Sequence, residues 1–225
     1  MSGNRYAELD KLIQEYEEDF IPISSERLMM KNFPKVLTMS SASLFEYNIK
    51  NTCKVFLDNP KNPIDTSYPL IARMFRNSKP VTDQMFAKIE AYNENGVEHL
   101  DATPFYALFG GDSFKNSVEH FFVNLLSQRL QSVSIIADAL LPLVEQDEKL
   151  ETDFAKYAIL KDELDLCTFA SAETAYLSLK LRRNRVAHDY IHGLSDTFED
   201  IRKFYTIAVI YVIALEEAIK DLTIT

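Results

Sequence analysis

Apolar residues recur at helical spacing through most of this chain of 225 residues. Over residues 198–222 they follow one another at steps of three and four, which is the pattern of a helix packed along its length in a bundle. The run 207–213 is rich in β-branched residues and compatible with a strand, but its charged neighbours keep helical phase, so we expect helix. The same spacing predicts further helices near residues 8–20, 40–57, 113–141, 145–163 and 171–191. Ser40 or Ser41 can cap the second of these, Pro142 ends or kinks the third, and Ser171 can cap the fifth. Gly193 then breaks the chain, and Ser195 or Asp196 can cap the last helix.

Prolines and glycines divide the chain into two unlike halves. Seven of the eight prolines lie at or before Pro104, and four of the five glycines lie at or before Gly111. Because these residues interrupt regular elements, we expect an irregular insertion over about 59–112. It contains short helices near residues 70–76 and 82–92 and then a loop over 93–112. A cluster of large apolar side chains in this loop anchors it to the core: Phe105, Tyr106, Leu108 and Phe109. The predicted fold is all-α, a helical bundle in one domain over 1–225 with this irregular insertion.

Composition narrows the functions that such a bundle can carry. Only five residues are glycine, which makes a glycine-rich phosphate loop difficult to build. The formal net charge is −10, so the chain is a poor general binder of nucleic acid. Between Lys180 and His192, however, four basic side chains stand against one aspartate. We therefore expect a small cationic cleft in an acidic body, able to hold a few phosphates at one place.

Other counts speak against a metal site and against a membrane. Cys53 and Cys167 are far apart and have no second Cys or His at ligand spacing, so we expect two buried thiols and no zinc. The first residues show no basic patch followed by an apolar run, unlike a signal peptide. No strongly apolar run approaches the roughly 20 residues of a membrane span. The sequence predicts a cytoplasmic protein that needs no metal or cofactor.

The helix predicted over 171–191 places two functional side chains on apolar stripes. Arg183 follows Tyr176 on one stripe, and His188 follows Leu181 on another, about 140° away on an ideal helix. An arginine turned toward a packed face costs several kcal/mol unless it is paired or faces a cleft. The placement indicates either a functional site that the two side chains flank, or a structural salt bridge from Arg183 to an acidic neighbour.

The polar face of the same helix adds Arg182 and Arg185, which we expect to contact the substrate. A histidine moves protons near neutral pH, and an arginine holds a phosphate by a two-pronged hydrogen bond. Together they suit attack by a ribose 2′-hydroxyl on the neighbouring phosphate, a reaction that needs no metal. His99 and His120 have no comparable neighbours and are expected in loops or at the surface.

The segment over 183–190, RNRVAHDY, resembles the signature of the HEPN superfamily, the nucleotide-binding domains of higher eukaryotes and prokaryotes. That pattern is an arginine, four to six residues and a histidine, often with asparagine after the arginine, as in Arg183, Asn184 and His188. Tyr190 matches a tyrosine found at this place in HEPN toxins of toxin–antitoxin pairs. Because the chain is longer than the compact toxins, it looks more like the larger stand-alone HEPN proteins of bacterial conflict systems.

The resemblance implies a metal-independent endoribonuclease of the toxin–antitoxin or phage-defence type, whose products carry a 2′,3′-cyclic phosphate. It implies that His188 acts as general acid/base or orients the 2′-hydroxyl, that Arg183 holds the scissile phosphate and that Asn184 orients this pair. Tyr190 would contact the substrate and matches the position that some antitoxins modify with AMP. The resemblance also implies a homodimer with the Arg and His of both protomers in one cleft, and a possible antitoxin or regulatory partner protein.

Two other functions remain compatible with the sequence. One is a HEPN module that binds a nucleotide or a protein without cleaving RNA. The other is an all-α scaffold in which Arg183 is salt-bridged and Tyr190 packs against Val186. Glu46 could reach the cleft from the second predicted helix, but its spacing with Lys50 favours a solvated face.

Overall fold

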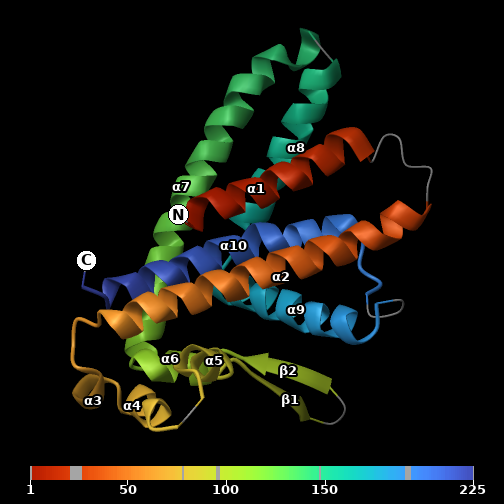
Figure 1. The fold of residues 1–225 in the computed structure, drawn as a ribbon. Coiled ribbons are helices and arrows are strands. Elements are labelled where there is room, and N and C mark those ends of the chain that lie inside the picture. The colour runs from red at the N-terminus through yellow and green to blue at the C-terminus, as the bar shows by residue number, and fades with distance from the viewer. Residues whose placement is uncertain are drawn as a thin grey trace.

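The computed structural model describes residues 2–20, 27–77, 79–94, 97–146, 148–190 and 194–224. Long helices form a bundle around α10 (Phe198–Asp221), which packs against α2 (Arg27–Asp58), α7 (Asp112–Leu140) and α9 (Phe169–His188) (Figure 1). The all-α fold class is confirmed, because the only sheet in the described part of the chain is one two-stranded hairpin.

The predicted seam of α10 forms the centre of the core. Its members within the helix are all buried: Phe198, Ile201, Tyr205, Ala208, Val212, Leu215 and Ile219. The β-branched run 207–213 is helical, as its phase predicts. No helix of the described ranges combines the length and the apolar content that crossing a membrane requires.

Helix α2 begins well before the predicted start at Ser40 or Ser41. Leu37, which is fully buried, extends the apolar stripe of Phe45 and Ile49 backward at helical spacing. Ser41 does not cap a helix; its Oγ donates to the Leu37 carbonyl at 2.7 Å, inside the same helix. The continuous stripe therefore outweighs the capping preference of serine, and Pro34 lies within the helix.

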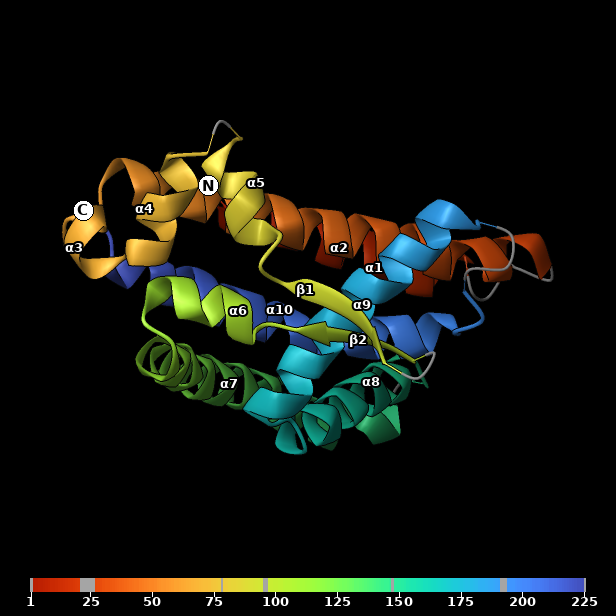
Figure 2. The ribbon, with the colours of Figure 1, turned by 90° about the horizontal axis from the view of Figure 1, so that it is seen from below.

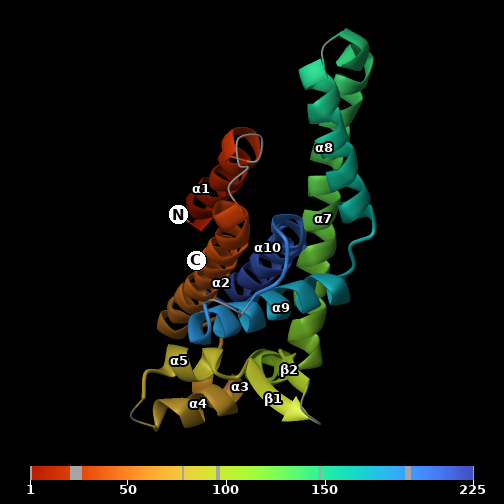
Figure 3. The same cartoon turned by 90° about the vertical axis from the view of Figure 1, so that its right-hand side faces the viewer.

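Helices α7 and α8 (Glu148–Asp165) form a long antiparallel hairpin. Helix α7 ends just before Pro142, as predicted, and a 3-10 segment, η3 (Leu141–Gln146), leads toward α8. The two helices pack against each other and rise away from the rest of the bundle (Figure 3). Helix α10 lies between this hairpin on one side and α1 (Ser2–Glu15) with α2 on the other (Figure 3).

The insertion corrects one part of the sequence prediction. Its short helices are α3 (Ile64–Ser67), α4 (Pro69–Phe75), α5 (Val81–Phe86) and α6 (Thr103–Tyr106), followed by a 3-10 turn, η2 (Ala107–Phe109). Where a helix to residue 92 and then a loop were expected, the chain forms an antiparallel hairpin of β1 (Glu90–Glu94) and β2 (Val97–Asp101) beside α9 (Figure 2). The intervening Asn-Gly dipeptide, itself outside the described residues, is typical of two-residue hairpin turns.

The predicted apolar anchor of the insertion is confirmed. Phe105, Tyr106, Leu108 and Phe109 are each at most 5% exposed and join the main hydrophobic core. Two glycines then turn the chain into α7, both with positive φ: 114° at Gly110 and 66° at Gly111. Residues other than glycine rarely adopt a positive φ of this kind, so the turn requires glycine at both positions.

Polar contacts hold α1 against α10. Tyr6 Oη donates to Glu216 Oε1 at 2.6 Å, and Tyr205 Oη donates to Asp10 Oδ1 at 2.8 Å. Glu216 is only 2% exposed. Burial raises the pKa of its carboxyl, although the hydrogen bond from Tyr6 and the charge of Lys220 act in the opposite direction.

This buried carboxyl predicts a pH-dependent stability. The folded protein holds the Glu216 proton more tightly than the unfolded chain does. The protonated carboxyl therefore contributes fully to the stability of the fold below its ordinary pKa of 4.5, and this contribution is lost as the pH rises through the raised pKa. Glu216→Gln, which stays neutral, is expected to raise the melting temperature by about 2–4 °C at pH 7.5 and to change it little at pH 4. Thermal unfolding of both proteins across this range measures the difference; an equal shift at both pH values would contradict it.

Candidate functional site

Helix α9 carries the predicted site and is fixed at its start by a capping box. Thr168 Oγ1 accepts from the Ser171 backbone N–H at 3.1 Å, and Ser171 Oγ accepts from the Thr168 N–H at 2.9 Å. The cap is therefore Thr168, three residues before the predicted one. The helix ends at His188 rather than near 191, because Asp189 leaves the helical backbone conformation. The predicted break at Gly193 lies outside the described residues, as does His192.

Arg183 lies on the buried stripe of α9 that the sequence predicts. Tyr176, Leu179 and Val186 on this stripe are at most 2% exposed. The Arg183 side chain is 25% exposed, and its Nη2 donates to Oε2 of Glu46 on α2 in a short charged hydrogen bond. The alternative of a salt bridge to an acidic neighbour is thereby confirmed. Glu46, expected on a solvated face, is instead 24% exposed because it faces α9.

Two lysines lie near the same carboxylate: Lys50, expected on a charged solvent face, and Lys180, which the sequence counts among the cations of the predicted cleft. Lys50 Nζ lies 2.9 Å from Glu46 Oε1 and 3.0 Å from a carboxylate oxygen of Asp83. Lys180 Nζ donates to the Ile89 carbonyl at 3.3 Å. The positions of these lysines follow from how α2 and α9 face each other, which no local sequence pattern reveals.

Electrostatics in this cluster follow from three cations around Glu46. Burial acts to raise the pKa of the Glu46 carboxyl, but the hydrogen bond from Lys50 and the charge of Arg183 outweigh it, so the pKa is lowered. Burial lowers the pKa of Lys180 to about 8; the charge of Glu46 opposes this shift, and the charges of Arg183 and Lys50 add to it. Two buried atoms beneath the cluster, Arg183 Nε and Tyr176 Oη, make no hydrogen bond within the described residues.

His188 faces a different place, a pocket of about 380 Å³ at the end of α9. The pocket has seven lining residues: Arg182, Arg185, His188, Asp189, Leu194, Ser195 and Asp196. His188 and Arg185 are exposed, whereas Arg183 is not among the residues that line the pocket. The structure thus brings His188 together with two of the predicted arginines and leaves the third at the Glu46 cluster.

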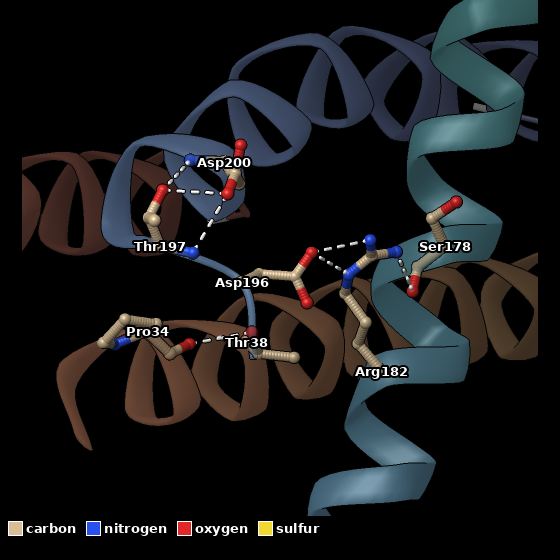
Figure 4. A network of polar contacts seen from close by, with 7 residues as sticks. All are labelled: Pro34, Thr38, Ser178, Arg182, Asp196, Thr197 and Asp200. Carbon is tan, nitrogen blue, oxygen red and sulfur yellow. Dashed lines mark hydrogen bonds and ion pairs between the residues drawn. The ribbon is translucent and has the colours of Figure 1, made fainter. Parts of the chain in front are cut away.

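Arg182, predicted as a substrate contact, ties the segment before α10 to α9. Its Nε and Nη2 donate to the same Asp196 oxygen at 3.0 and 2.7 Å (Figure 4). Its guanidinium also lies 4.4 Å from the centre of the Phe204 ring. The Arg182 guanidinium is therefore partly engaged in contacts within the protein that hold the walls of the pocket together.

The same view shows the start of α10. Thr197 and Asp200 form the capping box that begins this helix, where Ser195 or Asp196 was expected (Figure 4).

The remaining predicted residues, Asn184 and Tyr190, are not among the residues that line the pocket. Asn184 is half-buried, and Tyr190 is 50% exposed, so Tyr190 does not fill the buried stripe below Val186. Lys35 of α2 donates from Nζ to the Tyr190 carbonyl at 2.6 Å and lies 4.9 Å from the centre of its ring. The Tyr190 ring is accordingly held near α2 while one half of its surface stays open to solvent.

Metal ligands do not gather anywhere in the described ranges, where no three His, Cys, Asp or Glu side chains lie close enough to hold an ion. His120 is exposed on α7 and contacts Asn124 at 3.2 Å, as its predicted surface position requires. The side chain of His99 lies outside the described residues. Cys53 and Cys167 are buried free thiols, as predicted.

Comparison with known proteins finds no relative of this chain. No family model, no curated protein and no solved structure matches this chain. The interpretation of the site therefore rests on its residues and their geometry.

Proposed function

We propose that this protein is a metal-independent endoribonuclease of the toxin–antitoxin or phage-defence type. The observation that carries the proposal is the pocket at the end of α9, where an exposed His188 stands beside Arg182 and Arg185. A solvent-accessible histidine transfers protons at neutral pH, and arginines attract phosphate. The resemblance of the segment 183–190 to the HEPN signature supports the same activity.

In the proposed reaction, the His188 imidazole accepts the proton of a ribose 2′-hydroxyl, whose oxygen attacks the neighbouring phosphorus. The bond from phosphorus to the 5′-oxygen of the next nucleotide breaks, which leaves a 2′,3′-cyclic phosphate. Arg185, exposed at the pocket, balances the charge that develops on the phosphate oxygens. The departing 5′-oxygen takes up a proton, and His188 of a second protomer supplies it in a homodimer with one shared cleft.

Arg183 has a positioning role in this proposal rather than the phosphate contact that the resemblance implies. Its guanidinium is engaged by Glu46 and lies on the buried stripe of α9. The ion pair holds α9 against α2 and so fixes where the end of α9, with His188, is presented. The proposal also includes control by an antitoxin or regulatory protein in the cytoplasm, because an unrestrained ribonuclease harms its own cell.

A second candidate function is a HEPN module that binds a nucleotide or a protein without cleavage. The engagement of Arg183 by Glu46 favours it, since the arginine of the signature is then not free to hold a scissile phosphate. The two functions differ in whether RNA is cut.

The ends of the RNA fragments test the proposed reaction. We expect purified protein, incubated with single-stranded RNA loops in EDTA, to release fragments that carry a 2′,3′-cyclic phosphate and a 5′-hydroxyl, as measured by mass spectrometry. Fragments with a 3′-hydroxyl and a 5′-phosphate would contradict 2′-hydroxyl attack. Binding of RNA or nucleotides without any fragments would favour the second function.

A further inference from the structure

A large groove lies apart from the His188 pocket and shares no lining residue with it. Its volume is about 880 Å³, and its walls come from α1, α7, α8 and α10. Figure 3 shows the arrangement: α1 stands on one side, the α7–α8 hairpin on the other, and α10 runs between them. The groove is thus a channel between helices with α10 as its floor.

The groove is long and follows the helix axes. Its lining residues on α10 recur at steps of one or three positions from Phe198 to Ile213, a stretch of about 22 Å at 1.5 Å per residue. On α1 and the π-helical segment that continues it, η1 (Tyr16–Phe20), the lining runs from Tyr6 to Glu18, about 18 Å. A compact small molecule would fill one part of such a channel, whereas a helix of about 15 residues would fill its length.

The groove is apolar over one part of its length. Val209, Ile210 and Ile213 of α10 form the floor there, whereas Glu199, Arg202 and Thr206 lie nearer the start of α10. Aliphatic side chains of α1, α7 and α8 adjoin this apolar floor: Ile13, Leu125, Ile159 and Leu160. Ile159 on α8 is 53% exposed, and Val209 and Ile213 on α10 are only partly buried. Contiguous apolar surface left open in this way marks a contact site for an apolar partner.

The two rims of the groove carry opposite charge. On the α1 side stand Asp10, Glu17 and Glu18. On the opposite side, Arg129 of α7 and Lys156 of α8 are opposed by one carboxylate, Asp153, which lies 3.9 Å from Lys156 Nζ, so this side keeps a net positive charge. Part of this charge is compensated within the chain, because Arg202 Nε lies 3.6 Å from Glu17 Oε1. Glu18 and Arg129, by contrast, are exposed at the two rims.

We infer that this groove binds an amphipathic helix of a partner protein, with an apolar stripe on the floor, a basic edge toward α1 and an acidic edge toward α7 and α8. The apolar stripe would supply the binding energy, and the two charged edges would fix the direction and register of the helix. The inference concerns protein recognition and is independent of RNA cleavage at His188.

Selection from a displayed library of random 16-residue helical peptides against the full-length protein tests this inference. We expect enriched peptides with apolar residues at helical spacing, Lys or Arg along one flank and Asp or Glu along the other. Glu18→Lys and Arg129→Glu are each expected to weaken the best peptide about tenfold. The matched control is Glu15→Lys, which changes the same charge on α1 outside the groove and is expected to leave the affinity unchanged.

The charge-reversed double variant Glu18→Lys/Arg129→Glu provides the second measurement. A peptide with its two charged flanks exchanged is expected to bind this variant better than it binds the original protein, which a folding defect would not produce. Enriched peptides without helical spacing, or with affinities that ignore both reversals, would overturn the inference. A homodimer that Glu18→Lys abolishes and Glu15→Lys preserves would overturn it as well, since a second copy would then occupy the groove.

Discussion

Replacing His188 with alanine is expected to lower the rate of RNA cleavage about 100- to 10,000-fold, the usual contribution of a positioned general acid or base. The histidine is exposed at the end of α9 and makes no contribution to the core, so the folded structure should not depend on it. Cleavage rates measured under single-turnover conditions, together with the melting temperature, separate loss of chemistry from loss of fold.

His120→Ala is the matched control for this variant. His120 is also an exposed histidine, but it lies on α7 and does not line the His188 pocket. Its removal is expected to leave the cleavage rate unchanged. If both variants cleave as fast as the original protein, His188 carries no proton in the reaction and the proposed mechanism fails.

Replacing Glu46 with glutamine is expected to lower the free energy of unfolding by about 2 kcal/mol, between the values for exposed and buried ion pairs. Glu46 accepts from both Arg183 and Lys50, and Lys180 lies close enough for the charges to interact. The neutral side chain leaves these three cations with less counter-charge between α2 and α9. Urea unfolding of the variant measures the loss.

A double-variant cycle tests whether the loss comes from the ion pair. Once Arg183 is replaced by methionine, Glu46 has one fewer cation to compensate, so the two substitutions together should cost less than the sum of each alone. Additive losses would mean that the two side chains do not stabilise the fold through each other. Glu119→Gln, at an exposed place on α7, is the control for the removal of a surface charge.

Much of the bundle could be predicted because its helices bury continuous stripes. The seam of α10 extends over the whole helix, and burial of such a stripe decides the structure whatever the local propensity. The start of α2 could not be predicted from Ser41, because a serine inside a helix bonds to its own backbone as readily as it caps one. The hairpin at β1 and β2 was missed because its strands contain few β-branched or aromatic residues, although Asn-Gly signalled the turn.

The candidate site was predictable in its residues but not in its contacts. The helical phase placed Arg183 on a buried stripe, which required a partner. Its partner Glu46 lies 137 residues earlier in the chain, on a helix whose facing side is decided by packing. For the same reason the sequence does not reveal that Lys50 and Lys180 lie near Glu46, or that Asp196 engages Arg182. Helical spacing alone separates Arg183 from His188, and the structure keeps them at different places.

The most direct test of ribonuclease activity at His188 compares four reactions in EDTA. The original protein and His188→Ala are each incubated with an RNA loop and with the same sequence methylated at every 2′-oxygen. The proposed mechanism predicts fragments only from the original protein acting on unmodified RNA, because both the 2′-hydroxyl and the histidine are required. Fragments from His188→Ala or from the methylated strand, or no fragments in any reaction, would contradict it.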